Sequence, residues 1–239
     1  MNKILSGLET LGRNILNSND SKQKEYDFVW QHLSSCEKIL DIGCGAGLFL
    51  KYAPDRILGI DINPNNVAAC KSIGLQALVG DALKLEFPDN SFDGVLSSHV
   101  MHVFTAGQAM TFVKEMCRVC KPGGKIVVSL KHDHPYFWQN PENSRPYPPS
   151  VFYAMSAQQS SAEKPLLNPM WEDLPQFEPV DINFRRPPFY YFMMYRSRNR
   201  MRVSAALNVL QCKLGLKKYW TFDAYTIVLE NRKKQFLPE

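Results

Sequence analysis

Five short apolar runs, each closed by a small or acidic residue, follow one another between residues 38 and 130. They read KILDIG, RILGID, LQALVGD, FDGVLSS and KIVVSL. Each is rich in Val, Ile or Leu and lacks polar alternation, which is typical of strands buried on both faces of a parallel sheet. Helical stretches over 47–53, 64–73 and 106–120 separate them. The alternation predicts an α/β fold.

The segments on either side of these runs extend the pattern. Apolar residues recur at helical spacing over 20–35, after the cap candidates Asp20 and Ser21, and again over 199–214. The sequence DAYTIVLEN near the C-terminus has the character of a further strand. We therefore expect a mostly parallel sheet with helices on both faces.

The composition changes abruptly after the fifth run. Residues 132–195 contain fourteen of the chain's twenty-eight aromatic residues, and residues 132–188 contain eleven of its sixteen prolines. So many aromatic residues argue against a disordered linker, and so many prolines argue against long regular elements. We expect an ordered aromatic and Pro-rich insert after strand five that folds over the C-terminal edge of the sheet.

A glycine-rich turn follows the first run, in Ile39-Leu-Asp-Ile-Gly-Cys-Gly-Ala-Gly-Leu-Phe-Leu50. Gly43 and Gly45 allow backbone angles closed to other residues and a close approach of a ligand to the main chain. A dinucleotide-binding turn has the spacing G-x-G-x-x-G. The spacing here is G-x-G-x-G, with Asp41 two residues before the first glycine, and it fits NAD poorly.

Two carboxylates close the next two runs. Asp61 ends the second run, eighteen residues after Gly43, where a carboxylate can accept both hydroxyls of a ribose. Asp81 ends the third run, where it can accept a hydrogen bond from the exocyclic amine of adenine. Ligands of open α/β sheets bind beyond the carboxyl ends of the strands, so these residues are expected to converge on one crevice.

The motifs DIGCGAG, GIDINP, GDALKLEFPDNSFDGVLSSHVMH and EMCRVCKPGGKIVVS together resemble the class I S-adenosylmethionine-dependent methyltransferases, especially the ubiquinone/menaquinone-biosynthesis-like group. The resemblance covers about residues 38–130. It implies a Rossmann-like, seven-stranded, mostly parallel sheet with helices on both faces. It also implies an enzyme that binds S-adenosylmethionine and releases S-adenosylhomocysteine. The implied cofactor-binding residues are Asp41, Gly43, Gly45 and Gly47 at the methionine end, Asp61 and Ile62 at the ribose, Asp81 and Ala82 at the adenine, and Ser97 beside the donor methyl group.

The resemblance also implies one methyltransferase domain over residues 1–239. We divide it into N-terminal helices (1–37), a cofactor-binding core (38–131), a substrate-cap insert (132–198), and a last helix and strand (199–239). The cap departs most from the family pattern, so the acceptor of well-known members does not carry over to this chain.

Histidines follow the fourth and fifth runs. Methyl transfer needs a base only if the acceptor carries a proton at neutral pH, and His102 is the candidate catalytic base. The alternative for His102 is a structural role in capping the next helix. His132 and His134 flank Asp133, but ligands at consecutive positions rarely converge on one ion, so no metal site is expected.

The six cysteines show no disulfide framework. Cys117 and Cys120 have a spacing found in zinc and redox sites, but no second pair completes a site. They lie in a segment that reads as an amphipathic helix ending at Lys-Pro-Gly-Gly, with Phe112, Val113, Met116 and Cys120 on the buried face. We therefore expect buried thiols in a reducing, cytoplasmic location. No apolar run approaches the roughly 20 residues of a membrane span.

Basic residues concentrate near the C-terminus. Residues 185–234 hold twelve Lys or Arg and two Asp or Glu, whereas the whole chain has a net charge of +5. Within this part, an aromatic run over 188–195 precedes Arg196, Arg198, Arg200 and Arg202, which can grip a phosphate or carboxylate or form a solvated face. These features favour a small-molecule acceptor that is anionic or lipid-like and is methylated on O, N or C.

Three alternatives stay open. An RNA methyltransferase would use the basic C-terminal part, although the fourth run ends in Ser-Ser-His rather than in the Asn/Asp-Pro-Pro-aromatic signature of base amine methylation. A membrane-surface protein would use residues 189–202 as a peripheral anchor. A catalytically inactive regulator would bind S-adenosylmethionine without turnover. The sequence leaves the oligomeric state open.

Overall fold

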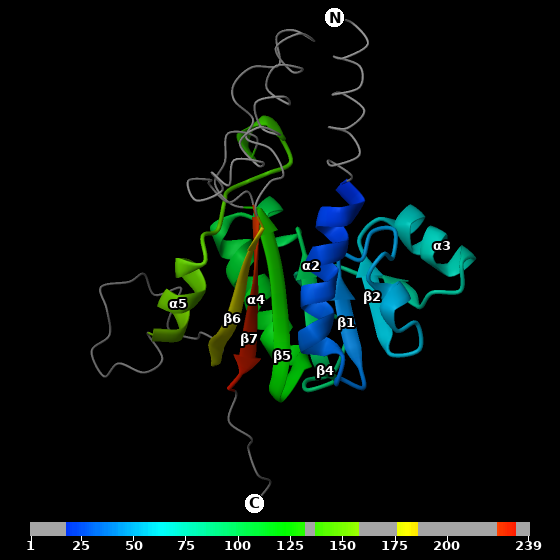
Figure 1. Ribbon diagram of the computed structural model, residues 1–239, viewed down its shortest axis with the longest axis horizontal. Helices are drawn as coiled ribbons and strands as arrows, with labels where there is room; N and C mark the ends of the chain where they lie inside the picture. Colours follow the sequence, from blue (N-terminus) through cyan, green and yellow to red (C-terminus); the bar gives the residue numbers. More distant parts are fainter. Residues whose placement is uncertain (1–17, 132–136, 158–175, 186–223, 233–239) are drawn as a thin grey trace, which may run out of the picture.

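The strands form one sheet of seven in the order β3-β2-β1-β4-β5-β7-β6, as the computed structural model in Figure 1 shows. The structure describes residues 18–131, 137–157, 176–185 and 224–232. The strands are β1 (Ile39–Ile42), β2 (Ile57–Asp61), β3 (Ala77–Val79), β4 (Phe92–Ser98), β5 (Cys120–Lys131), β6 (Phe177–Arg185) and β7 (Ala224–Asn231). Strands β1 to β5 pair in parallel, and β7 is antiparallel to β5 and β6. The predicted Rossmann-like, mostly parallel sheet is confirmed.

Helices cover both faces of this sheet (Figure 1). On one face, α2 (Ser18–Leu33) and α3 (Pro64–Ser72) contribute to a core with alternate residues of β1, β2, β4, β5 and β7. On the other face, α4 (Ala106–Val119) and α5 (Ser150–Ala157) pack with the remaining strand residues. Because successive strand side chains point to opposite faces, burial on both sides explains the unalternated apolar runs of β1, β2, β4 and β5. The expected burial is wrong for the third run, because β3 is an edge strand in which Leu78 and Val79 are 44% and 59% exposed.

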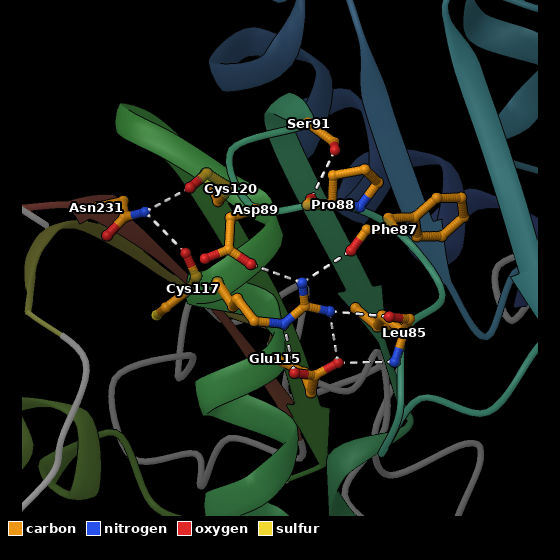
Figure 2. A network of polar contacts seen from close by, with 10 residues as sticks. Leu85, Phe87, Pro88, Asp89, Ser91, Glu115, Cys117, Cys120 and Asn231 are labelled. Atoms are coloured by element: carbon orange, nitrogen blue, oxygen red, sulfur yellow. Dashed lines mark hydrogen bonds and ion pairs between the residues drawn. The ribbon is translucent and has the colours of Figure 1, made fainter. Parts of the chain in front are cut away.

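The helix α4 has the buried face that the sequence predicts. Phe112, Val113 and Met116 of α4 are each at most 2% exposed, and so is Cys120, which begins β5 directly after the helix ends at Val119. Cys117 and Cys120 are buried free thiols, and burial raises the pKa of Cys120 to about 12. Asn231 at the end of β7 donates from its side chain to the carbonyls of both cysteines and so completes the helix C-terminus (Figure 2).

Residues 47–53, predicted to be helical, form only the 3-10 turn η1 (Leu50–Tyr52). Gly47 has a φ of +71°, which a right-handed helix cannot include. At the other end, Pro54 restricts the preceding residue to extended angles, and Ala53 has φ −155° and ψ 80°. The stretch between these two restrictions is too short for an α-helix.

The insert after β5 contains regular elements that the sequence analysis does not locate. Both α5, of eight residues, and β6, of nine, lie within residues 132–198, where the prolines are expected to prevent long regular elements. Pro179 is tolerated because β6 is an edge strand whose register shifts between Pro179 and Asp181. The strand β6, one of the seven strands of the sheet, therefore comes from inside the predicted cap.

Several predicted segments lie outside the described residues. These are the helix over 199–214, the aromatic and arginine-rich stretch over 188–202, and residues 132–136 and 158–175 of the cap. Within the described part of the chain, no helix has the length and apolar character of a membrane span.

Arg118 of α4 connects this helix to the loop that leads from β3 into β4. Figure 2 labels the partners of Arg118 in this loop and on the helix. Its guanidinium donates to the carbonyls of Leu85 and Phe87 at 2.8 Å and to the carboxylates of Asp89 and Glu115 at 2.7 to 2.9 Å. Glu115 in turn accepts from the amide of Leu85 at 2.7 Å. The planar fork of arginine suits such a set of acceptors, so Arg118 fixes the loop that follows Asp81.

We expect Arg118→Gln to lower the free energy of unfolding by about 2 kcal/mol, because charge-assisted hydrogen bonds to two loop carbonyls are lost. The matched control is Lys114→Gln, one turn earlier on the same helix, for which we expect a change within about 0.5 kcal/mol. Chemical denaturation measures both. Equal stability of the two variants would contradict the role of Arg118.

Candidate functional site

Four predicted site residues lie at the carboxyl ends of neighbouring parallel strands. Asp41 is the third residue of β1, Asp61 ends β2, Asp81 follows β3, and Ser97 is the penultimate residue of β4. The order β3-β2-β1-β4 places these ends side by side along one edge of the sheet. The edge is where open α/β sheets bind their ligands.

The glycine-rich turn after β1 depends on left-handed backbone angles. Gly43, Gly45 and Gly47 have φ values of +76°, +52° and +71°. A Cβ on Gly47 would lie 2.8 Å from the side chains of Cys70 and Leu75, so packing requires glycine there. A Cβ on Gly45 would meet nothing within 4 Å, so its Cα faces open space. Of the three glycines, Gly45 is therefore the one that leaves room for a ligand against the main chain.

Asp61 ties this turn to the start of α3. One carboxylate oxygen accepts from the amide of Gly45 at 2.9 Å, and the other accepts from the amide of Asn63 at 2.8 Å and the side chain of Asn66 at 3.2 Å. A carboxylate has about four acceptor positions, so capacity remains for a further donor. The neighbouring Ile62 is 74% exposed, as expected of a residue that faces a ligand or solvent.

Asp41 is buried beneath the turn. The side chain is 3% exposed, and burial raises its pKa to about 7. The positive charge of Lys22 on α2 opposes this rise, and the negative charge of Asp61 adds to it. A cationic ligand beside this buried carboxyl group would lower its pKa, because a nearby positive charge favours the ionised form.

Asp81 and Ala82 lie at the far end of the same edge. Asp81 is exposed, and its carboxylate accepts from the amide of Leu83 at 2.8 Å. Ala82 is half-buried and packs against the core cluster of the α4 face. An exposed carboxylate next to an apolar surface is compatible with a polar, flat ring such as adenine.

Buried polar atoms without partners concentrate at the end of β4. Ser97 is 0% exposed and His102 is 2% exposed, and neither Ser97 Oγ nor His102 Nδ1 has a hydrogen-bond partner among the described residues. The same holds for Nδ1 of His99. Buried polar atoms are nearly always paired, so three such atoms in one segment indicate a place where ligand or water completes the bonding.

His102 lies in the 3-10 turn η2 (Met101–Val103), between strand β4 and helix α4. Its ring centroid is 5.9 Å from that of Phe137 and 6.1 Å from that of His99. Burial lowers the pKa of His102 to about 3, with a contribution from Lys131. The helix-capping alternative for His102 is wrong, because Thr105 and Gln108 form the capping box of α4.

Glu25 of α2 is a site residue that the sequence analysis misses. Its carboxylate is 6% exposed and is surrounded by donors from three elements. They are Lys22 of α2 (3.1 Å), Ser98 of β4 (2.8 Å), His99 after β4 (3.1 Å) and Arg185 of β6 (3.4 Å). These partners hold the pKa of Glu25 well below its ordinary value despite burial. The sequence does contain a signal for this site residue, because Glu25 lies four positions before Val29 and therefore on the apolar stripe of the predicted helix.

This network fixes His99 in an uncommon conformation. His99 has a φ of +61°, its amide donates to the carbonyl of Ser129 at 2.8 Å, and its Nε2 faces Glu25. Burial lowers the pKa of His99. A histidine with a left-handed backbone conformation is stable only where surrounding contacts stabilise that conformation. Such residues cluster at functional sites.

The remaining candidates fall into two groups. His132, Asp133 and His134, together with the arginines over 196–202, lie outside the described residues. Among the aromatic residues of the insert, Phe137 is buried against His102, whereas Trp138 and Tyr153 are 59% and 47% exposed. Within the described ranges, no group of three His, Cys, Asp or Glu side chains is placed to hold a metal ion.

A family model described as a methyltransferase domain matches residues 40–128. The probable tRNA methyltransferase 9B of Bos taurus is 36% identical over 109 residues, which is 45% of this chain and 22% of that protein. The fatty-acid O-methyltransferase of Mycolicibacterium smegmatis is 33% identical over 97 residues, 37% of this chain and 35% of that protein. The demethylmenaquinone methyltransferase of Corynebacterium glutamicum is 32% identical over 139 residues, 53% of this chain and 58% of that protein.

The match therefore spans less than two thirds of each of these relatives. Among solved structures, a SAM-dependent methyltransferase from Archaeoglobus fulgidus aligns with a TM-score of 0.61 at 18% identity, over 93% of this chain and 99% of that one. At this identity the likeness supports the fold alone.

The raised pKa of Asp41 predicts a pH-dependent stability. The folded protein keeps a proton that the unfolded chain releases, so the stability from Asp41 is present below about pH 4 and is lost as pH rises through about 7. We expect wild-type protein to lose stability relative to Asp41→Asn between these pH values. Denaturant titrations at matched pH measure the difference, with Asp55→Asn on the exposed surface as the control. A pH-independent difference would refute the assignment.

Proposed function

Since the chain carries a class I S-adenosylmethionine-dependent methyltransferase domain, we propose that it transfers the methyl group of this cofactor to a small-molecule acceptor. The observation that carries the cofactor site is the bond between Gly45 and Asp61. It joins the open glycine turn to the carboxylate at the end of β2, the position from which a ribose is held in nucleoside-binding α/β folds.

We assign the residues along the edge to parts of the cofactor. Asp41 would face the methionine ammonium group, and the turn at Gly43, Gly45 and Gly47 would lie along the methionine portion. Asp61 and Ile62 would hold the ribose. Asp81 and Ala82 would flank the adenine, and Ser97 would lie beside the reacting methyl group. The raised pKa of Asp41 supports the first assignment, because a cation there favours the carboxylate.

When bound, the cofactor supplies a methyl group made electrophilic by the sulfonium. The protein then has to orient the acceptor in line and exclude water. His102 lies at the right strand end, but a pKa of about 3 makes it a weak proton acceptor. We therefore propose that His102 acts as a neutral hydrogen-bonding group that orients the acceptor through Nδ1, rather than as a strong base.

An RNA acceptor is the second candidate. It is favoured by the similarity to a protein named as a tRNA methyltransferase. Against it, β4 ends in Ser97, Ser98 and His99 and lacks the Asn/Asp-Pro-Pro-aromatic signature. The relatives named for a fatty acid and for demethylmenaquinone support a small, apolar or anionic acceptor. We keep a cytoplasmic location as our expectation, and the five described cysteines are free thiols.

Calorimetric titration with S-adenosylhomocysteine tests the cofactor assignment. We expect Asp61→Asn and Asp81→Ala each to weaken binding by about tenfold or more, because each removes a charged hydrogen-bond acceptor. The matched control is Asp55→Asn, an exposed aspartate before β2. Circular dichroism verifies folding of each variant. Unchanged affinity in both site variants would refute the assignment.

His102→Gln and His102→Leu separate the two roles of this residue. We expect the glutamine variant to keep more turnover than the leucine variant, because an amide still offers a hydrogen bond at that place. Cofactor affinity should be the same in both. If the pH–rate profile of the wild-type protein shows an ionisation that is absent from both variants, His102 acts instead as a base.

A further inference from the structure

The two ring nitrogens of His99, directly after β4, have different surroundings. Nε2 lies 3.1 Å from the carboxylate of Glu25 on α2, whereas Nδ1 is buried and has no hydrogen-bond partner among the described residues. The nitrogens lie on opposite sides of the imidazole ring, so Nδ1 points away from Glu25. Buried polar atoms are nearly always paired, so Nδ1 is a place where a bound molecule can complete the hydrogen bonding.

The carboxylate of Glu25 determines which nitrogen of His99 carries the hydrogen. Burial opposes the ionisation of Glu25, but His99, Lys22 and Ser98 together hold its pKa well below the ordinary value. An ionised carboxylate only accepts hydrogen bonds, so Nε2 of His99 has to be the donor. In a neutral imidazole the other nitrogen is then a bare acceptor. His99 therefore presents the lone pair of Nδ1.

The charge state of His99 suits the uptake of a proton at Nδ1. Burial lowers the pKa of His99, so the ring is neutral at pH 7. The negative charge of Glu25 opposes this shift and would stabilise the imidazolium formed when a proton arrives. The neighbouring His102 lacks this support, because burial lowers its pKa to about 3 and the charges of Lys131 and His99 lower it further.

His99 lies beside the turn to which we assign the methionine portion of the cofactor. The next residue, Val100, packs against Gly43 so closely that a Cβ on this glycine would lie 2.3 Å from Val100 Cγ2. Ser97, which we place beside the reacting methyl group, lies two residues before His99 on the same strand. The amide of His99 donates to the carbonyl of Ser129 on β5 and fixes the backbone at this point.

We propose that His99 is the general base of the methyl transfer and takes the proton of a hydroxyl acceptor through Nδ1, with Glu25 as the positioning residue. The proposal rests on the methyltransferase function proposed above and names the chemistry of the acceptor. A carboxylate has no proton to lose and needs no base, whereas a hydroxyl group keeps its proton at neutral pH.

The step balances without a further reactant. A lone pair of the hydroxyl oxygen forms the bond to the methyl carbon as the carbon–sulfur bond breaks, and the electrons of that bond stay on sulfur. The hydroxyl proton passes to Nδ1 of His99, and the imidazolium later releases it to water. The products are a methyl ether, S-adenosylhomocysteine and one proton.

Nitrogen NMR of the imidazole rings tests the tautomer without any acceptor. Correlation of ring nitrogens with ring hydrogens distinguishes a nitrogen that carries hydrogen from a bare one. At pH 7 we expect His99 to carry hydrogen on Nε2 and to have a bare Nδ1, with its signals identified by their loss in His99→Gln. A neutral ring with the hydrogen on Nδ1 would overturn the proposal whether or not the protein turns over.

Product analysis tests the acceptor class. The full chain is incubated with methyl-labelled S-adenosylmethionine and a cell extract, and in parallel with phenols and aliphatic alcohols, each paired with its methyl ether as a blank. We expect label in the hydroxyl compounds as ethers that resist mild alkali. Label confined to alkali-labile esters or to amines would overturn the proposed acceptor and leave the methyltransferase function standing. Label confined to RNA would favour the second candidate function, and no label in any fraction would contradict both proposals.

Variants of the pair test the base role. We expect His99→Gln to lower kcat by about 100-fold or more, with the affinity for S-adenosylhomocysteine unchanged. The matched control is His32→Gln, a histidine of α2 that pairs with Asp181 and should keep full turnover. Unchanged kcat in His99→Gln would overturn the proposal.

The pH profile adds a readout that a purely structural role would not change. The rate should fall as pH drops through the pKa of His99, which lies below about 6.5. Lys22, Arg185 and His102 face His99 together with Glu25. Glu25→Gln removes the negative charge among them, so we expect a lower kcat and a shift of this limb to lower pH. A lower kcat with an unshifted limb would contradict the coupling of Glu25 to His99.

Chemical rescue of His99→Gly separates proton transfer from packing. Glycine accepts the φ of +61° at this position and leaves space for a ring. We expect added imidazole to restore part of the turnover, and 1,2,4-triazole, which has the same shape but is a much weaker base, to restore far less. Equal rescue by both rings, or none by either, would overturn the base role.

Discussion

The carboxylate of Asp61 organises one half of the sheet edge, where we propose that the cofactor binds. It accepts from the amide of Gly45 in the turn after β1, and from Asn63 and Asn66 at the start of α3. Two crossover connections of the parallel sheet thus meet at one side chain. The turn needs this support, because the Asp61 carboxylate is the acceptor that pairs the amide of Gly45. The open space above Gly45 follows from the same arrangement.

A second buried carboxylate organises the other half. Glu25 connects α2 to the ends of β4 and β6 through Ser98, His99 and Arg185. Removing a partner from such a cluster is costly, because it leaves a charge buried without compensation. The unpaired polar atoms of Ser97, His99 and His102 belong to the same end of β4.

Much of this arrangement is predictable from the sequence, because it depends on local patterns. Buried parallel strands give unalternated apolar runs, and their closing residues Asp61 and Asp81 are found at the same edge. Residues 47–53 have the apolar spacing of a helix, but they form only the 3-10 turn at Leu50–Tyr52. Gly47 and Pro54 restrict the backbone at the two ends of this stretch and leave too few residues for an α-helix. The strand β6 was not predicted because it contains Pro179, which is tolerated in a sheet at an edge position or a bulge. Glu25 and Arg185 lie 160 residues apart, and no local pattern indicates that they meet.

Hydrogen exchange with and without S-adenosylhomocysteine tests the central claim most directly, because it locates the bound cofactor on the chain without reference to turnover. The account predicts slower exchange in the turn over 43–47, at the start of α3 after Asp61, and in the segment that follows Asp81. These regions are far apart in sequence and meet only at the carboxyl edge of the sheet. Protection confined to other segments, or none at saturating ligand, would contradict the placement of the cofactor at this edge.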